Sequence, residues 1–302
     1  MTAREALSGV LLIDKPAGIT SHDVVQKVRR IFGQREVGHA GTLDPFATGL
    51  LVLGLGRATR LLRFIEAAEK RYVGTVVLGV ATTTLDAEGE VTETRSIEGI
   101  GIGEGEIQRA LASLRGEIDQ RVPAFSAVHV AGERLYARAR RGEAVETPVR
   151  RVQIHHLEAV RIALPEVDIE ARVSKGTYVR ALAAQIGDAL SVPAHLKTLR
   201  RLSVGPFRIE DARGTERLLG VASELVPMER ALDSLAAITV DETGAEDVRH
   251  GRRLSRAQIA AGGGASGSAG DALRIHGAGG ALLAVGILRD DGGLDYACVL
   301  VR

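Results

Sequence analysis

Residues 38–51 read GHAGTLDPFATGLL, and this stretch decides how the rest of the sequence is interpreted. It places one carboxylate, Asp44, in a glycine-rich loop directly before a proline, and an apolar run follows from residue 50 to residue 55. Pro45 disfavours the helical region for Asp44, while the glycines allow sharp turns. We therefore expect Asp44 on a stiff loop directly before a buried strand, and binding and catalytic groups often lie on such loops. Taken alone, the pattern also fits an ordinary turn aspartate, because Asp-Pro favours turns.

The composition is that of a globular protein with material for one large core or two domains. The chain has 302 residues, of which 45% are hydrophobic and 25% are charged. A single cysteine, Cys298, excludes an intramolecular disulfide and fits a reducing compartment. The first residues lack the apolar stretch of a signal peptide, and no segment approaches the ~18 apolar residues of a membrane span. We therefore expect a cytoplasmic protein.

Charge is unevenly distributed along the chain, although the formal net charge is only +1. Residues 121–209 contain 15 Lys and Arg against 8 Asp and Glu, whereas residues 210–250 contain 4 against 10. This polarity suits an electrostatic footprint for a nucleic acid on one face. From composition alone, solvated surface charges remain the alternative explanation.

Hydrophobic periodicity predicts interleaved helices and strands without a βαβ rhythm. Helices are expected at 21–32, about 57–68, 107–114, from Thr177 to 190 with Thr177 as the cap, and 228–235. Strands are expected at 72–80, 167–173, 238–240, 273–275, 282–288 and 296–301. Residues 85–105 are rich in glycine and acids and are predicted to form a surface excursion. The chain is thus predicted to be α+β, with a mixed or antiparallel sheet.

The sequence of residues 38–51 resembles that of the active-site loop in the bacterial tRNA pseudouridine synthases of the TruB family. Other segments resemble further motifs of that family, in the family's order, between residue 10 and about residue 209. These segments are residues 14–25 (DKPAGITSHDVV), Lys70-Arg71-Tyr72, Phe125-Ser126-Ala127 with Gly132, Leu135-Tyr136 and Ala139-Arg140, Ser174 to Arg180 (SKGTYVR), and Leu199-Arg200-Arg201-Leu202 after His195. The resemblance implies isomerisation of uridine 55 in the T loop of tRNA to pseudouridine, by base flipping and without a guide RNA.

The same resemblance implies roles for individual residues. Asp44 is the nucleophile, Arg180 pairs with it, and Tyr72 stacks on the target base, with a hydroxyl able to transfer a proton. The residues implied in substrate and RNA binding are His39, Tyr178, Leu199, Lys15, Arg134, Arg138, Arg140 and Arg141. Considered singly, several of these residues also fit plain structural roles: a strand tyrosine, a polar turn histidine, core packing. The reaction is an isomerisation with no net oxidation or reduction and no added group. Neither a metal nor a cofactor is therefore expected.

The resemblance also implies the architecture. We expect a pseudouridine synthase fold with a central sheet flanked by helices over residues 1–235, including an RNA-binding flap at about 121–151. Residues 236–302 are expected to form a small barrel-like domain of the PUA type that binds RNA. The expected partner is the T arm of tRNA, bound by a monomer without an obligatory protein partner or a membrane. Two rival hypotheses are a guide-RNA-dependent pseudouridine synthase subunit and a non-catalytic tRNA-folding chaperone.

Overall fold

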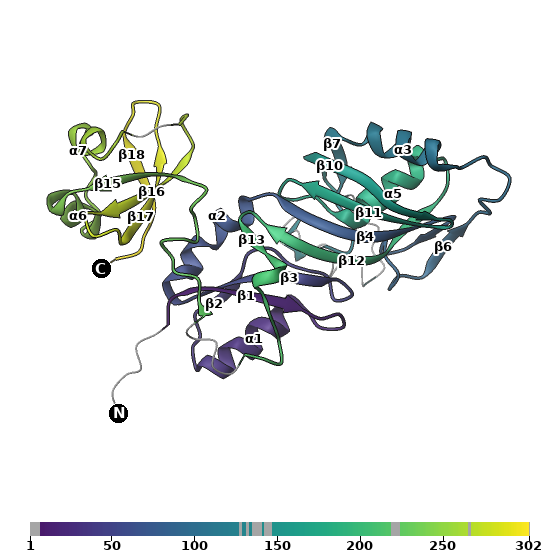
Figure 1. The fold of residues 1–302 in the computed structure, drawn as a ribbon, viewed down its shortest axis with the longest axis horizontal. Helices are drawn as coiled ribbons and strands as arrows, with labels where there is room; N and C mark the ends of the chain where they lie inside the picture. The colour runs from purple at the N-terminus through teal and green to yellow at the C-terminus, as the bar shows by residue number, and fades with distance from the viewer. Residues whose placement is uncertain are drawn as a thin grey trace.

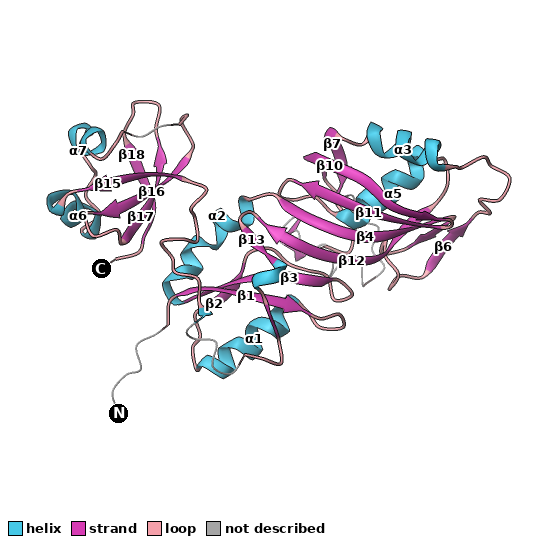
Figure 2. Ribbon diagram, in the orientation of Figure 1, coloured by secondary structure: helices cyan, strands magenta, loops and turns pink. Residues whose placement is uncertain are grey.

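The computed structural model describes residues 7–126, 129–130, 133–134, 141, 147–218, 224–264 and 267–301. Figure 1 shows a large twisted sheet flanked by helices, with a smaller sheet formed by the C-terminal part of the chain beside it. Figure 2 shows that strands dominate both parts and that helices lie on their faces. The expected α+β class is confirmed.

The larger sheet contains ten strands. Eight of them follow the order β14-β1-β3-β12-β4-β11-β10-β7, while β13 pairs with β12 and β2 pairs with β3. Their bounds are β1 (Gly9–Lys15), β2 (Val37–His39), β3 (Thr48–Leu55), β4 (Lys70–Leu78), β7 (Gly116–Arg121), β10 (Val149–Ala163), β11 (Glu166–Val173), β12 (Ala194–Val204), β13 (Phe207–Arg208) and β14 (Arg213–Gly214). Neighbours run antiparallel except for the pairs β1–β14 and β3–β12, so the sheet is mixed, as predicted.

The sheet has a seam where β3 meets β12. These strands pair at only two positions, Arg200 opposite Thr48 and Arg201 opposite Gly49. Gly49 has a φ of 101°, and a Cβ atom there would lie 2.3 Å from the carbonyl oxygen of Arg201. Only glycine allows this close approach. Because β3 begins directly after the loop that carries Asp44, the seam brings β12 beside that loop.

Helices cover the sheet and enclose its cores. Their bounds are α1 (Ser21–Phe32), the 3-10 helix η1 (Gly56–Leu61), α2 (Leu62–Ala67), α3 (Glu104–Ser113), α5 (Val179–Ala189) and the 3-10 turn η2 (Ile209–Asp211). The helix predicted at 21–32 is confirmed, with Thr20 and Asp23 forming a capping box and Gly33 in the left-handed region after it. The helix predicted at about 57–68 is instead divided into η1 and α2. The main core lies between the sheet and helices α3 and α5.

Two expectations about connecting segments need correction. Residues 85–105 are not only a surface excursion: the short pair β5 (Val80–Thr82) and β6 (Val91–Thr94) encloses a turn in which Asp86 is buried. Residues 228–235 form successive turns and not a helix, with short-range bonds such as Ala231 N–H to the carbonyl of Met228. A further small pair, β8 (His129–Val130) and β9 (Glu133–Arg134), lies within the expected flap.

The C-terminal part forms its own sheet, in the order β15-β16-β17-β18. Its elements are β15 (Ala236–Val240), α6 (Glu242–Arg249), α7 (Arg256–Ala261), β16 (Ala272–Gly277), β17 (Leu282–Leu288) and β18 (Leu294–Val299). A hydrophobic cluster of its own joins helices α6 and α7 to this sheet. The strands predicted from residue 238 onward are therefore present.

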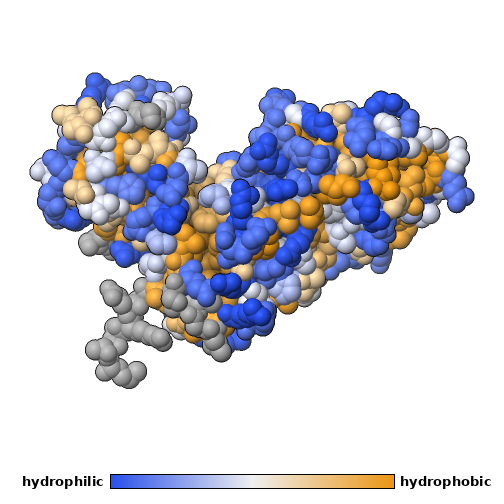
Figure 3. All heavy atoms as spheres, viewed as in Figure 1, coloured by the Kyte–Doolittle hydropathy of each residue, from blue (hydrophilic) through white to orange (hydrophobic). Residues whose placement is uncertain are grey.

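A second hydrophobic cluster joins the C-terminal sheet to the rest of the protein. It contains Leu61 and Ile65 before residue 235 and Leu282, Val285 and Leu300 after it. Figure 3 shows hydrophobic residues where the two parts adjoin, between more hydrophilic surfaces. The core thus continues across the boundary that the sequence suggested.

Three exposed arginines extend this contact along the free edge of β18. Arg57 donates to the carbonyl of Leu300 at 3.1 Å, Arg60 donates to that of Val299 at 2.6 Å, and Arg63 donates to that of Ala297. They stand three residues apart along η1 and α2, so they project from one side of this helical segment. We call these three contacts the arginine joint.

Candidate active site

The loop before β3 is held from one side by the start of α1. Ser21 Oγ accepts a hydrogen bond from the backbone N–H of Leu43 at 2.9 Å and lies 3.1 Å from the carbonyl of the same residue. The N–H of Gly18 donates to the carbonyl of Pro45 at 2.9 Å. The loop therefore presents Asp44 on a backbone fixed on both sides of it, as its sequence predicted.

Two buried cationic side chains, Lys15 and Arg201, bind backbone carbonyls of the same loop and its neighbours. The ammonium of Lys15 donates to the carbonyls of Pro16, Ile19 and Pro45 at 2.9, 2.8 and 3.2 Å. Arg201 donates from Nε to the carbonyl of Leu50 at 2.7 Å. Its Nη2 and Nη1 reach the loop carbonyls of Gly41 and Thr42, at 3.1 and 3.4 Å. Among the described residues, neither cation is paired with a carboxylate. They stabilise the loop through its backbone.

Lys15 requires a correction. The sequence placed it among the RNA-binding residues, but its side chain is fully buried under the loop. Burial lowers the pKa of its ammonium from 10.5 to about 8, and the negative charge of Asp44 opposes that shift. At neutral pH the ammonium is still the main form. Lys15 therefore acts on the loop backbone in this structure and does not face an RNA.

The carboxylate of Asp44 is bound by Arg180. Arg180 Nε lies 2.9 Å from Oδ2 and Nη2 lies 3.3 Å from Oδ1, so the guanidinium grips both oxygens. The Arg180 side chain is only 4% exposed, whereas that of Asp44 is 35% exposed, on the side of the cleft. The carboxylate is thus anchored from within the protein and accessible from outside.

Arg180 also ties down two other segments. Its Nη1 donates to the carbonyl of Thr84 at 2.8 Å and lies 3.4 Å from Oδ2 of Asp86. Its Nη2 donates to the carbonyl of Phe125 at 3.0 Å. One guanidinium therefore connects the Asp44 loop, the turn at 84–86 and the segment that contains Phe125.

Asp86 is a site residue that the sequence analysis did not single out. It is buried, and its Oδ1 accepts bonds from Thr84 Oγ1 at 2.5 Å and from the N–H of Glu88 at 3.0 Å. Leu85, just before it, has a φ of 63°, a backbone conformation that is strained for leucine. Strain at a turn that delivers a carboxylate to Arg180 is typical of a functional site. An Asp in an acid-rich, glycine-rich stretch gives no sequence signal for this position.

The electrostatics of Asp44 result from opposing effects. Burial raises the pKa of this carboxyl above its usual value of 3.8, and the charge of Asp86 acts in the same direction. The Arg180 guanidinium opposes both by favouring the ionised form. Burial and the second acid outweigh the guanidinium, so the pKa of the Asp44 carboxyl is shifted upward.

Helix α5 brings Arg180 into place without the predicted cap. The helix begins at Val179 after Tyr178, and no side chain caps it from its own segment. Thr177 instead bonds back to the carbonyl of Ser174 at 3.0 Å. The N–H of Tyr178 is satisfied by Gln120 Oε1 at 2.7 Å, and Gln120 also contacts Gln185 in α5 at 3.1 Å. Buried Gln120 on β7 therefore fixes the start of the helix.

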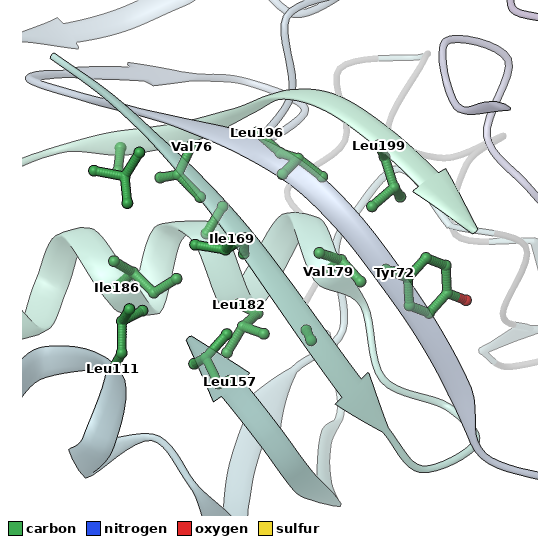
Figure 4. Close-up of a cluster of buried hydrophobic side chains, with 14 of the residues drawn as sticks. Tyr72, Val76, Leu111, Leu157, Ile169, Val179, Leu182, Ile186, Leu196 and Leu199 are labelled. Carbon is green, nitrogen blue, oxygen red and sulfur yellow. The ribbon is translucent and has the colours of Figure 1, made fainter. Parts of the chain in front are cut away.

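A cleft of about 1250 Å³ opens above Asp44. Tyr72, Tyr178 and Leu199 line it together with Asp44 and Arg180, so the structure brings these five predicted residues together. Figure 4 shows Tyr72 beside Leu199 and Val179 at the edge of the main core, with its hydroxyl directed away from the packed aliphatic side chains. The ring is thus packed on one side and borders the cleft on the other.

Positive side chains surround this cleft. Those that line it, in addition to Arg180, are Arg63, Lys70, Arg150, Arg151, Lys175 and Arg201. Lys70 is buried and donates to the carbonyls of Glu66 and Ala68, and burial lowers its pKa to about 8. Arg151 lies within 3.1 Å of Glu117. The exposed members of this set, Arg63, Arg150, Arg151 and Lys175, give the cleft a cationic surface beside its apolar wall, which suits a nucleotide attached to a phosphate backbone.

The remaining predicted residues lie outside the cleft or outside the described residues. His39, at the end of β2, does not line the cleft, and its buried Nδ1 has no hydrogen-bond partner within the described part of the chain. Burial lowers the pKa of His39 and favours its neutral form. Arg138 and Arg140 lie outside the described residues, as does the side chain of Arg134. Arg141 is described and exposed.

Three side chains of the kinds that bind metal ions lie close together elsewhere in the described residues. His156, Glu158 and Glu170 on β10 and β11 offer ligand atoms within 4.8 Å of one another. Arg71 already binds Glu170 through two bonds of 2.7 and 2.8 Å, which occupies both carboxylate oxygens. None of the three residues lines the cleft. This group therefore lies apart from the cleft that contains Asp44 and Arg180.

No helix in the described residues is both long and apolar enough to cross a membrane.

Comparison with known sequences identifies the family. The family described as "TruB family pseudouridylate synthase (N terminal domain)" matches residues 29–179. The chain belongs to the TruB family. A tRNA pseudouridine synthase B from Leifsonia xyli subsp. xyli is 49% identical over 253 residues, covering 82% of this chain and 83% of the relative. One from Geobacillus kaustophilus is 44% identical over 260 residues, covering 82% and 91%.

Solved structures agree with the fold of this TruB member. The chain is similar to one in a Cbf5-Nop10-Gar1 complex, with 26% identity and a TM-score of 0.76 over 97% of this chain and 85% of the other. A protein of an H/ACA RNP bound to a substrate RNA containing 2'-deoxyuridine gives a TM-score of 0.74 at 24% identity, over 97% and 85%. The likeness covers the C-terminal sheet as well as the larger one.

Proposed function

We propose that this chain converts uridine 55 in the T loop of tRNA to pseudouridine, acting alone and without a guide RNA. Membership of the TruB family supports this function, as do relatives named tRNA pseudouridine synthase B that match more than four fifths of the chain. The observation that carries the proposal is the carboxylate of Asp44, gripped by buried Arg180 and accessible in a cationic cleft.

The reaction breaks the N1–C1′ bond of uridine, turns the base and joins C5 to C1′. The product is an isomer of the substrate, so one nucleophile and positioning groups account for it without added atoms or electrons. Asp44 forms the covalent bond, either to C1′ of the sugar or to C6 of the base. The proton that leaves C5 ends on N1, and the hydroxyl of Tyr72 borders the cleft in which this transfer takes place.

Arg180 supports this chemistry in two ways. Its charge favours the ionised, nucleophilic form of the Asp44 carboxylate and so opposes the effect of burial on the pKa. Its two-point grip fixes the orientation of the carboxylate, which reduces the entropy to be lost in the reaction. Asp86 and the carbonyls of Thr84 and Phe125 hold the guanidinium itself.

The base reaches Asp44 only after leaving the stacked T loop, which costs a few kcal/mol. The cleft offers compensating contacts: the ring of Tyr72 for stacking, and Tyr178 and Leu199 for the uracil pocket. Cationic residues at the cleft bind the flanking phosphates, with help from the flap arginines Arg134, Arg138, Arg140 and Arg141. His39, at the end of β2, is proposed to take the place of the flipped base in the T loop.

The C-terminal sheet is proposed to be a PUA-like module that binds tRNA away from the target uridine. The protein is proposed to work as a cytoplasmic monomer. A guide-dependent role is the second candidate, favoured by the structural likeness to the Cbf5-Nop10-Gar1 complex. The higher identity to enzymes named tRNA pseudouridine synthase B supports the stand-alone role.

The test is mass mapping of pseudouridine in an unmodified tRNA transcript incubated with the purified chain alone. We expect one pseudouridine at position 55, and none in a matched transcript with cytidine at that position. Modification only after addition of a guide RNA would support the second candidate. Binding and refolding of tRNA with no pseudouridine at any enzyme concentration would identify a chaperone instead.

A further inference from the structure

The cleft contains one buried polar group without a partner. Ser126 lines the cleft and is only 5% exposed, yet its Oγ has no hydrogen-bond partner among the described residues. Two other described side-chain atoms are in the same condition, Nδ1 of His39 and Nε of Arg29, and neither residue lines the cleft. Of these three atoms, only Ser126 Oγ belongs to a residue that lines the cleft.

The backbone next to Ser126 is tied to the Asp44–Arg180 pair. The carbonyl of the preceding residue, Phe125, accepts from Arg180 Nη2, and the same nitrogen donates to Oδ1 of Asp44. The N–H of Val122 donates to the carbonyl of Pro148 at 3.0 Å, which closes the base of the flap around this segment. Ser126 thus follows directly a backbone group that is tied to the Asp44–Arg180 pair.

A second serine shows what a satisfied hydroxyl looks like at the same loop. Ser21 is 1% exposed, and its Oγ contacts both the N–H and the carbonyl of Leu43. Both serines are buried. Ser21 contacts the Asp44 loop directly, and Ser126 follows Phe125, whose carbonyl accepts from Arg180. Ser21 has its partners inside the protein, whereas Ser126 Oγ has none among the residues that the structure describes. A buried polar group normally has a partner, because leaving it unpaired costs free energy.

We propose that Ser126 is a substrate-positioning residue whose hydroxyl bonds an oxygen of the uridine held against Asp44. The inference rests on the proposed function. A hydroxyl both donates and accepts, so it fits the ribose 2′-hydroxyl or a carbonyl of uracil equally well. In either case the bond forms only in the complex, beside the atoms where the glycosidic bond is exchanged, and it orients the nucleotide toward the carboxylate.

The test compares Ser126→Ala and Ser126→Cys with the matched control Ser21→Ala. Cysteine retains the size of serine with a much weaker hydrogen bond. We expect both Ser126 variants to lower the single-turnover rate of pseudouridine formation about tenfold, the value of one hydrogen bond. The Kd for tRNA changes little, because phosphate contacts dominate affinity. The Tm of the free protein stays the same or rises, whereas Ser21→Ala lowers it.

A transcript with 2′-deoxyuridine at position 55 separates the two partner oxygens. If the ribose hydroxyl is the partner, Ser126→Ala causes no additional loss on this substrate; if a uracil carbonyl is the partner, the tenfold loss persists. An unchanged rate for Ser126→Ala on the normal transcript overturns the inference, as does a fall in Tm equal to that of Ser21→Ala. Wild-type protein that forms no pseudouridine would instead overturn the proposed function.

Discussion

Two regions of the molecule hold backbone carbonyls with cationic side chains, and they differ in burial. Under the Asp44 loop, Lys15 and Arg201 are almost completely buried and bind carbonyls of the loop and its neighbours. In the arginine joint, Arg57, Arg60 and Arg63 are exposed and bind carbonyls along the edge of β18. Water can replace a partner in the joint but not under the loop, so the same bond has different consequences in the two places.

The comparison explains why the floor of the cleft is rigid. A buried cation must find polar partners, and here it finds them in the backbone of the reactive loop. Arg180 binds both kinds of partner: the carboxylates of Asp44 and Asp86, and two backbone carbonyls. The loop and its nucleophile are therefore held by interactions that are costly to break, whereas the C-terminal sheet is attached by apolar packing with exposed arginines around it.

The largest effect is expected for Arg180→Lys at the floor. Lysine keeps the charge but has a single point of contact, so it cannot grip both oxygens of Asp44 while holding the carbonyls of Thr84 and Phe125. We expect the single-turnover rate to fall about 100- to 1000-fold. Arg161→Lys is the control, because Arg161 pairs with Asp168 on the exposed face of the sheet at 2.6 Å. A single-turnover rate for Arg180→Lys within tenfold of wild type would contradict the proposal that Arg180 orients the Asp44 carboxylate.

The next effect is on stability and compares the two regions directly. Arg201→Met leaves the carbonyls of Leu50, Gly41 and Thr42 without their buried donor, so the free energy of unfolding should fall by about 3 kcal/mol or more. Arg60→Met in the joint should lower it by less than about 1 kcal/mol, because its carbonyl partner is solvated. Urea unfolding of both variants measures the difference. Equal losses would mean that burial does not distinguish the two regions.

The pH dependence of the rate tests the charge balance at Asp44. Burial and Asp86 raise the pKa of Asp44 above 3.8, and only the ionised carboxylate is a nucleophile. The single-turnover rate should therefore fall as the pH is lowered through this raised pKa, at a pH above 3.8. In Asp86→Asn the acid limb should move to lower pH, since one of the causes that raise the pKa is gone. A limb that moves upward in that variant would contradict the balance described here.

The smallest effect is expected in the arginine joint. The double variant Arg57→Gln/Arg60→Gln should lose about 1 kcal/mol of stability or less and keep its rate at saturating tRNA. Leu282→Ala, in the cluster that crosses residue 235, should lose about 2–5 kcal/mol. Thermal melting and activity of both full-length variants make the comparison. These substitutions are a cleaner probe than removal of residues 236–302, which would also expose that cluster. A larger loss in the double variant than in Leu282→Ala would show that the arginines, and not the apolar cluster, hold the parts together.

The sequence predicted the local features of the site and missed those that depend on distant segments. Glycine and proline placed Asp44 on a loop before a buried strand, and the structure agrees. Arg180 was correctly placed in the first turn of a helix, although its start is fixed by Gln120 rather than Thr177. Asp86 was missed because its role is created by a strained turn at Leu85 and by contact with Arg180. Lys15 was misplaced because nothing in its motif indicates on which side of the loop the ammonium lies.

The most direct test of the central claim is the single-turnover reaction of Asp44→Asn with unmodified tRNA, with the Kd for tRNA measured on the same protein. The amide has nearly the shape of the carboxylate but is not a nucleophile. We expect no pseudouridine at position 55 even after long incubation with excess enzyme, while the Kd remains within a few-fold of wild type because phosphate contacts provide most of the affinity. Pseudouridine formed by Asp44→Asn protein, free of wild-type contamination, would show that another group is the nucleophile.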